Sequence, residues 1–263
     1  VADLRITLIT EKELAAMKLF EVQKFLNKML KAPIEASIVG DLARDKALPL
    51  MNKYFGSLAN RENKNLDSLR QFKTVNKALF KKLEVKTVTN KAYVMTGYRL
   101  EGEYSVKERR CVTLLSQILS TRLHEEIREK RGLTYGASAR REFSDAYKSY
   151  HSFYGSFVAE PKKAEEGLEA AREVMKEFLT EGPTDEELKT VKKKIETLVK
   201  STQEKPSYWS SRLADLRYHK TDFKDLATVQ ESYQSITKEE LMTVIKRFYK
   251  ENQKFEILSL PKT

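Results

Sequence analysis

The sequence predicts an α+β fold, a two-layer α/β domain in which helices cover a mostly antiparallel sheet, preceded by the tail of a homologous domain. Three observations support this prediction. A long amphipathic helix begins at Ser105, two strands follow it over 133–141 and 148–159, and one helix–strand pattern occurs twice, over 17–38 and 236–259. The helix has a continuous apolar face, which indicates that it packs on a sheet.

Four predicted helix starts share one local signal, a Ser or Thr followed three residues later by Glu. In this capping box the hydroxyl accepts a hydrogen bond from a free backbone amide, and the Glu accepts one from the amide of the capping residue. Gly182 and Pro183 separate the third of these helices from one expected over 161–180. The four pairs are Thr10 with Glu13, Ser105 with Glu108, Thr184 with Glu187, and Thr237 with Glu240.

Residues 17–38 and 236–259 each contain an amphipathic helix, a short polar break and a strand centred on a Glu. Aligning Glu35 with Glu256 also matches the apolar positions of the two helices and requires only a two-residue insertion. Such an internal repeat indicates a duplicated unit. The aligned apolar pairs are Val22 with Leu241, Phe25 with Val244, and Leu26 with Ile245.

The repeat sets the expected domain boundaries. A helix over about 43–58 follows the first copy, and the residues after it are polar and at first without periodicity, as in a linker. Because the first residue is Val1 rather than Met, we expect the chain to be cut from a longer one. The expected parts are 1–58, the C-terminal part of a preceding α/β repeat domain; 59–82, a linker; and 83–263, a complete C-terminal α/β domain.

The complete domain begins with strand candidates over 85–88 and 92–100, with a turn at 89–91. The helix from Ser105 should end at Gly132, since glycine readily adopts the left-handed conformation that closes helices. The next two strands should form a β-hairpin that turns around 143–146. Apolar residues of the helix recur at steps of three and four: Cys111, Leu114, Leu115, Ile118, Leu119, Leu123 and Ile127.

Composition excludes several classes of protein. With one Cys and three His in 263 residues, the chain cannot be a disulfide scaffold, a zinc finger or a zinc ribbon. No apolar run reaches the roughly 18 to 20 residues that a membrane span needs, and the N-terminus lacks the basic and apolar blocks of a signal peptide. The sequence therefore predicts no membrane span, and it leaves the compartment open.

The formal net charge is +11, which invites comparison with nucleic-acid binders. The Lys-rich stretches alternate with acidic residues, for example over 186–196, and this pattern is typical of solvated helix faces. A basic nucleic-acid or anionic-surface binder is therefore the weakest of the functional hypotheses, and we expect no nucleic-acid partner.

The chain lacks the motifs of a self-sufficient enzyme. His124-Glu125-Glu126-Ile127-Arg128 matches the zinc motif H-E-x-x-H except at its last position, and a guanidinium that stays protonated cannot bind zinc. Nucleophile-elbow and phosphate-loop motifs are absent. Cys111 lies on the apolar helix face, where a free thiol is normally a small core residue. We expect no metal and no cofactor in this chain.

Arg128 and Tyr135 are the best candidates for chemistry. Arg128 falls in the last helical turn and Tyr135 at the start of the next strand, so both can project from one edge of the sheet. A guanidinium and a phenol there would suit a carbonyl oxygen or carboxylate that gains charge. The structural alternative is that Arg128 pairs with Glu125 or another acid, while Tyr135 is half-buried sheet packing.

Three segments resemble the second half of the pitrilysin and insulinase family of zinc metallopeptidases. The most specific is REKRGLTY at 128–135, preceded by SQILSTRLHEEI. IEASIVGD at 34–41 with ALPLMNKYFGSL after it is similar to a domain-ending strand and the following helix of the family. TEGPTDEELKTVKKKI at 180–195 extends the resemblance, which covers most of the chain.

The resemblance implies the C-terminal half of a zinc-dependent endopeptidase that is inactive alone. Zinc would belong to a complementary N-terminal half, in the same polypeptide or a separate subunit, and peptides would be the substrates. Arg128 and Tyr135 would face the metal across a closed chamber and support substrate and transition state. The family also implies an alternative, a catalytically inactive scaffold or substrate-recognition subunit. Bacterial relatives suggest a periplasmic or cell-envelope location.

Overall fold

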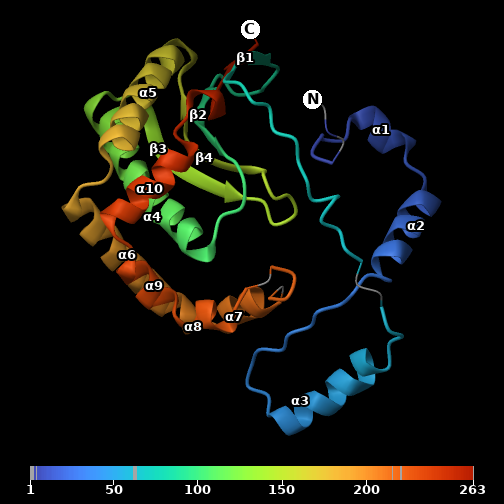
Figure 1. Cartoon of the computed structure of the whole chain (residues 1–263). Coiled ribbons are helices and arrows are strands. Elements are labelled where there is room, and N and C mark those ends of the chain that lie inside the picture. The colour runs from blue at the N-terminus through green and yellow to red at the C-terminus, as the bar shows by residue number, and fades with distance from the viewer. Residues whose placement is uncertain (1–2, 4, 62–63, 215, 220, 263) are drawn as a thin grey trace. The chain divides into compact units, whose positions relative to one another are not determined.

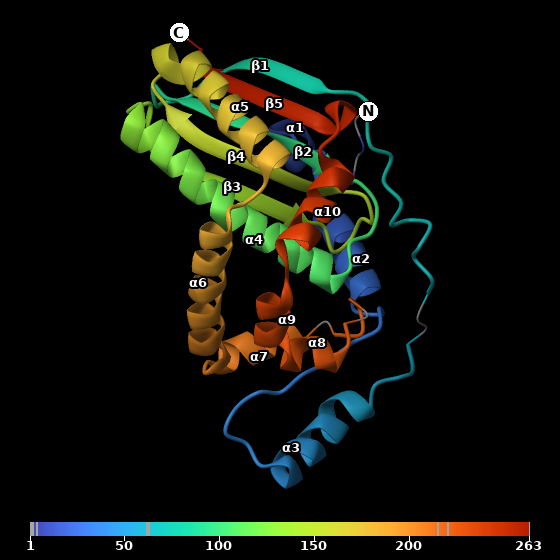
Figure 2. The same cartoon turned by 60° about the vertical axis from the view of Figure 1, so that its left-hand side comes forward.

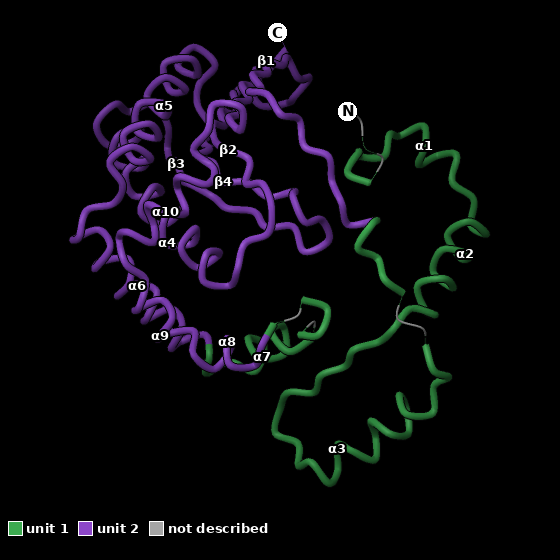
Figure 3. The backbone as a smooth tube through the Cα atoms, viewed as in Figure 1, with its two compact units in different colours: residues 1–68, 203–221 green, residues 69–202, 222–263 purple. Residues whose placement is uncertain are grey.

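A computed structural model describes residues 3, 5–61, 64–214, 216–219 and 221–262 of the chain. The chain divides into two compact units (Figure 3). Unit 1 comprises 1–68 and 203–221, and unit 2 comprises 69–202 and 222–263. Among the described residues, no helix combines the length and apolar character that crossing a bilayer requires.

The described residues of unit 2 form one five-stranded sheet (Figure 2). Its strands are β1 (Leu79–Val85), β2 (Ala92–Leu100), β3 (Thr134–Phe143), β4 (His151–Ala159) and β5 (Lys254–Pro261). They lie in the order β1–β5–β2–β4–β3. β1 runs parallel to β5, whereas the other neighbouring pairs are antiparallel. The predicted α+β class with a mostly antiparallel sheet is therefore confirmed.

The hairpin and β2 are confirmed, but the strand expected over 85–88 is misplaced. The strand in this part of the chain is β1, which ends at Val85, so the prediction is wrong for residues 86–88. β1 forms an edge of the sheet and pairs with β5, where Leu79 lies opposite Phe255. Because that partner is almost 180 residues away in sequence, local turn signals could not place the strand.

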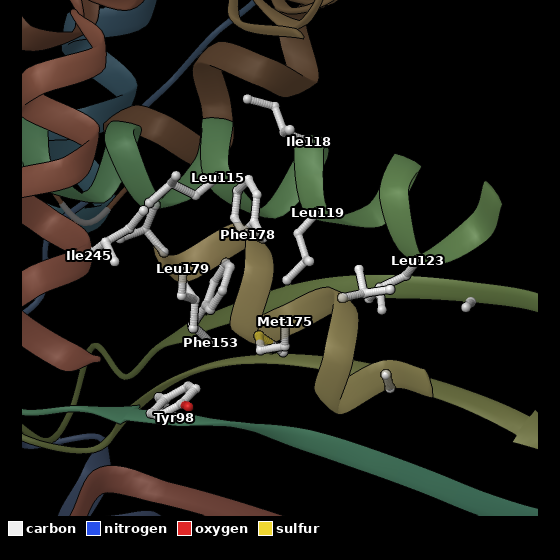
Figure 4. Packing of buried hydrophobic residues seen from close by; sticks show 14 of the residues in the cluster. Tyr98, Leu115, Ile118, Leu119, Leu123, Phe153, Met175, Phe178, Leu179 and Ile245 are labelled. Carbon is white, nitrogen blue, oxygen red and sulfur yellow. The ribbon is translucent and has the colours of Figure 1, made fainter. Parts of the chain in front are cut away.

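Three helices cover one face of the sheet: α4 (Val106–Leu123), α5 (Ala164–Glu181) and α10 (Lys238–Phe248) (Figures 1 and 2). The predicted apolar face of α4 is buried from Cys111 to Leu123. Side chains of all three helices meet those of β2 and β4 in one core, where Phe153 packs among Leu115, Phe178 and Ile245 (Figure 4). The two layers thus share a single hydrophobic core.

All four predicted capping boxes are formed. Ser105 caps α4 and Thr237 caps α10, each with the reciprocal bond from its own amide to the Glu three residues later. At the third box the Thr184 amide donates to Glu187 at 2.7 Å. Gly182, at φ 78°, closes α5 at the break that the sequence predicted between the two helices. Helix starts therefore follow from short-range chemistry alone.

The remaining helices complete the two units, and those between 206 and 235 have no counterpart in the predictions. Those outside the site are α1 (Glu11–Ala16), α2 (Leu19–Met29), α3 (Arg44–Met51), η1 (Asn52–Gly56), η3 (Pro161–Lys163), α6 (Asp185–Gln203), α7 (Pro206–Leu213), α8 (Phe223–Ala227), α9 (Val229–Ser235) and η4 (Glu251–Gln253).

Unit 1 has helices but no core, since none of its described residues is buried. The helix of the first repeat forms as α2, yet no strand forms over 34–41. A strand needs a paired neighbour to satisfy its backbone, and the described part of unit 1 offers none. Phe25 on α2 is 61% exposed, whereas its counterpart Val244 on α10 is 3% exposed.

His151 provides a test of the packing at the β3–β4 hairpin. Its ring is buried, and Nδ1 accepts a hydrogen bond from the Ser144 amide at 3.0 Å. Burial, together with the positive charge of Arg109, lowers the pKa of His151. We expect its contribution to stability to be complete above the ordinary pKa of about 6.5 and to decline as pH falls through the lower folded-state pKa.

The measurement is urea unfolding of the chain between pH 7.5 and 5. The loss expected on acidification is about 1 kcal/mol, the scale of one hydrogen bond that becomes unavailable when Nδ1 is protonated. His151→Gln removes the titrating group, so its unfolding free energy should vary less over this range. If the unfolding free energies of the two proteins depended equally on pH, the stabilising role assigned to His151 would be wrong.

Candidate functional site

Arg128 lies in η2 (His124–Lys130), a π-helical segment that continues α4. Ile127 anchors the segment because its side chain is fully buried. The segment ends as predicted at Gly132, whose φ of 58° lets the chain turn toward β3. There the Gly132 amide donates to the Arg128 carbonyl at 3.1 Å, and the Leu133 amide to the Ile127 carbonyl at 2.9 Å. This closure holds Arg128 on the exposed side of the turn.

The Arg128 side chain is exposed and contacts His124, with Nη1 3.0 Å from Nε2 of the imidazole. In the described part of the chain, no carboxylate lies within ion-pair distance of its guanidinium. The neighbouring Glu126 is instead bound by Lys130 at 2.8 Å and Arg131 at 3.0 Å, and these hydrogen bonds lower the pKa of Glu126. Arg128 therefore keeps its charge unneutralised, unlike the surrounding cations.

Tyr135 is 85% exposed and lies in a β-bulge at the start of β3. Between Thr134 and Ala137 the register with β4 shifts, so that these residues face Ala159 and Phe157. The Thr134 hydroxyl stabilises the bulge by donating to the Val158 carbonyl at 2.6 Å. A bulge re-aims the side chains of a strand. Tyr135 thus projects away from the core instead of packing on the sheet.

A hollow of about 320 Å³ adjoins Tyr135. The Lys91 ammonium lies 5.5 Å from the centre of the Tyr135 ring, in cation–π geometry. The hollow is lined by residues from the start of β2, from β3 and from the end of β4. Its lining comprises Lys91, Tyr93, Thr134, Tyr135, Gly136, Ser138, Arg140, Ser156, Phe157 and Val158.

The structure thus places both predicted residues on the surface at the two ends of one short connection, 129–134. It does not bring their side chains into contact: Arg128 lies against His124, whereas Tyr135 lies with Lys91. Sequence reasoning missed Lys91, which directly precedes β2, and Arg140 in β3, although both line the hollow. Their only sequence signal is the alternation Gly136, Ser138, Arg140, which puts these residues on one face of β3.

The other chemically reactive side chains are structural. Burial raises the pKa of the Cys111 thiol to about 11, so this sulfur is not a ready nucleophile. His124 contacts Arg128, and His151 supports the hairpin. Within the described residues, no three His, Cys, Asp or Glu side chains gather where they could hold a metal ion. The described residues therefore offer no donor set that fits a zinc site.

Comparison with known proteins identifies a family. The profile of the family described as "Peptidase M16 inactive domain" matches residues 17–195. The chain is also 27% identical over 118 residues to the chloroplastic stromal processing peptidase of Pisum sativum, and this match covers 45% of the chain but 9% of that relative. The chain therefore spans a small part of the curated relative that it matches.

Two solved structures share the fold. The peptidase M16 inactive domain from Pseudomonas fluorescens aligns with a TM-score of 0.74 and 21% identity, over 96% of this chain and 60% of that one. The periplasmic protease PqqL from Escherichia coli aligns with a TM-score of 0.69 and 19% identity, over 85% of this chain and 25% of that one. Since the family profile covers more than half of the 263 residues, the chain belongs to the M16 peptidase family, as a member of its inactive domain.

Proposed function

We propose that this chain is the C-terminal, non-zinc half of a zinc-dependent endopeptidase and that it supplies Arg128 and Tyr135 opposite the zinc site of an N-terminal half. The observation that carries the proposal is that both side chains are exposed without a structural task. Arg128 has no carboxylate partner among the described residues, and Tyr135 is not packed on the sheet. An exposed aromatic and an unneutralised cation are available for a substrate.

The chemistry required of the pair is hydrogen bonding to a peptide backbone. The guanidinium of Arg128 can donate to a carbonyl oxygen, and so can the hydroxyl of Tyr135. Both bonds strengthen as that oxygen gains negative charge during hydrolysis, so they stabilise the transition state more than the bound peptide. In the complementary half, zinc would polarise the scissile carbonyl and activate water.

The domain organisation belongs to the same proposal. Residues 1–58 would end a preceding α/β repeat domain, 59–82 would link it, and 83–263 would form the complete C-terminal domain. The exposed apolar face of α2 supports this division, since its counterpart on α10 is buried within a sheet domain. We also propose a periplasmic or cell-envelope location, as the family resemblance suggests for bacterial members.

The test is to assay the purified chain alone and mixed with a zinc-binding N-terminal half, using quenched fluorescent peptides. Alone, the chain should hydrolyse no peptide, because its described residues do not fit a metal site. The mixture should hydrolyse peptides, and a chelator should abolish this activity. Chelator-sensitive hydrolysis by the chain alone would contradict the division of labour. A mixture that binds peptides without cleaving them would favour the inactive scaffold.

A further inference from the structure

We propose that the hollow beside Tyr135 binds a carboxylate of the peptide substrate, so that the chain favours peptides with a negative charge near the bound segment. This inference rests on the proposed function, because it concerns the substrate of the same site. It names a chemical class, the carboxylate, which can come from an Asp or Glu side chain or from a peptide C-terminus.

The charge of the hollow carries the inference. Lys91 and Arg140 line it, and no acidic residue does. In the described part of the chain, neither cation has a carboxylate within ion-pair distance, although many other surface cations of unit 2 do. The nearest acid along β3 is Glu142, which instead accepts a hydrogen bond from the Tyr154 hydroxyl at 2.6 Å. The hollow therefore has positive charge without an internal counter-ion.

The remaining lining suits the rest of a peptide. The hydroxyls of Ser138 and Ser156 make no hydrogen bond within the described part of the chain, so they remain to bind polar groups of a ligand. Tyr93 and Val158 add apolar surface, since they are 38% and 47% exposed. A few oriented polar groups beside apolar surface are typical of ligand sites.

The position of Lys91 connects the hollow to the proposed catalytic support. Its ammonium lies over the Tyr135 ring, so a carboxylate bound by Lys91 would hold the peptide next to the Tyr135 hydroxyl. Charge-assisted hydrogen bonds to guanidinium and ammonium groups are stronger than neutral ones, which makes the charge a basis for selection. The selectivity would then act on the part of the peptide that Tyr135 contacts.

The experiment measures binding, by fluorescence anisotropy of labelled peptides with the purified chain. Four peptides of one backbone distinguish the sources of the carboxylate: a Glu peptide with an amidated C-terminus, a neutral peptide with a free C-terminus, a neutral amidated peptide and a Lys amidated peptide. We expect one of the first two to bind about tenfold or more tightly than the neutral amidated peptide, the scale of a charged hydrogen bond. The Lys peptide should bind most weakly.

Matched variants locate the effect. The double variant Lys91→Gln/Arg140→Gln should lose the preference for the carboxylate, whereas Lys81→Gln/Lys176→Gln removes the same charge outside the hollow and should keep it. Circular dichroism melting of both variants checks folding, which the exposed positions should leave unchanged. Equal affinity for all four peptides would overturn the inference, and so would an equal loss of the carboxylate preference in both double variants.

The outcome is separable from that of the proposed function. If carboxylate selectivity is missing but Arg128→Ala still abolishes turnover of the assembled enzyme, the hollow is wrongly assigned and the proposed function stands. If the selectivity is present but substitution of Arg128 and Tyr135 leaves turnover unchanged, the hollow binds peptides and the catalytic role assigned to the pair is wrong.

Discussion

Arg128→Ala is expected to lower kcat/KM of the assembled peptidase by about 100-fold or more, the typical effect of removing one donor to a developing oxyanion. The fold should not change, because the side chain is exposed and its contact in the described structure is a single hydrogen bond to His124. The measurement combines steady-state kinetics on a fluorescent peptide with urea unfolding of the isolated chain.

Tyr135→Phe separates the hydroxyl from the ring. The ring stays beside Lys91, so peptide binding and fold stability should persist while turnover falls by a similar factor. Lys130→Ala is a matched control two residues from Arg128, since it removes an exposed ion pair with Glu126 that contributes little to stability. If the control loses as much activity as Arg128→Ala, or if Arg128→Ala unfolds the domain, the pair has a structural role.

Local signals predicted much of the fold. The four capping boxes, the left-handed Gly132, the helix break at Gly182 and the apolar face of α4 each depend on residues within a few turns of one another. Such features follow from short-range hydrogen bonding and periodicity. β1 and the missing strand over 34–41 show the limit, because a strand exists only where a distant partner supplies its hydrogen bonds.

In the candidate site, too, the sequence predicts only what depends on residues close together in the chain. Arg128 and Tyr135 are seven residues apart, so the sequence alone places them at one turn. The hollow is different, because Lys91 and Arg140 come to line it only through the pairing of β2 with β4 and of β3 with β4. The bulge that turns Tyr135 outward also has no sequence signature beyond Gly136, since it depends on the register with Ala159 and Phe157.

The two Glu residues that match in the repeat, Glu35 and Glu256, lie in different environments. Glu256 is 5% exposed in β5 and is bound by Arg172 from α5, with Nε–Oε1 at 2.9 Å and Nη2–Oε2 at 2.7 Å. Lys254 lies 3.2 Å away and adds a second positive charge. Glu35, at the matching position, is exposed and accepts hydrogen bonds from the Arg217 amide. A buried carboxylate requires such cations, which the described part of unit 1 does not give Glu35.

Arg172→Met is expected to destabilise unit 2 by about 3 kcal/mol, because it leaves the Glu256 carboxylate buried without its bidentate partner. We place the loss at the lower end of the range for broken buried pairs, since the Arg172 side chain is 34% exposed and Lys254 remains nearby. Arg172→Lys is the conservative control: it keeps the charge but not the fork geometry, so it should lose less.

The dependence on pH distinguishes this mechanism from simple loss of packing. Burial alone would raise the pKa of Glu256, but the hydrogen bonds from Arg172 and the charge of Lys254 bring it below its ordinary value of 4.5. In the natural protein this stabilisation is present above pH 4.5 and is lost as pH falls through the lower folded-state pKa. Without Arg172, burial favours the protonated carboxyl of Glu256. Lowering the pH should therefore reduce the destabilisation of the Arg172→Met variant instead of increasing it.

Urea unfolding at pH 7 and pH 4 measures the difference. The difference in unfolding free energy between the natural protein and Arg172→Met should be larger at pH 7 than at pH 4. In the double variant Arg172→Met/Glu256→Gln the side chain of residue 256 has no charge, so most of the loss at pH 7 should be recovered. A difference that is equal at the two pH values and persists in the double variant would mean that Arg172 stabilises the domain by packing along α5, with no contribution from the ion pair.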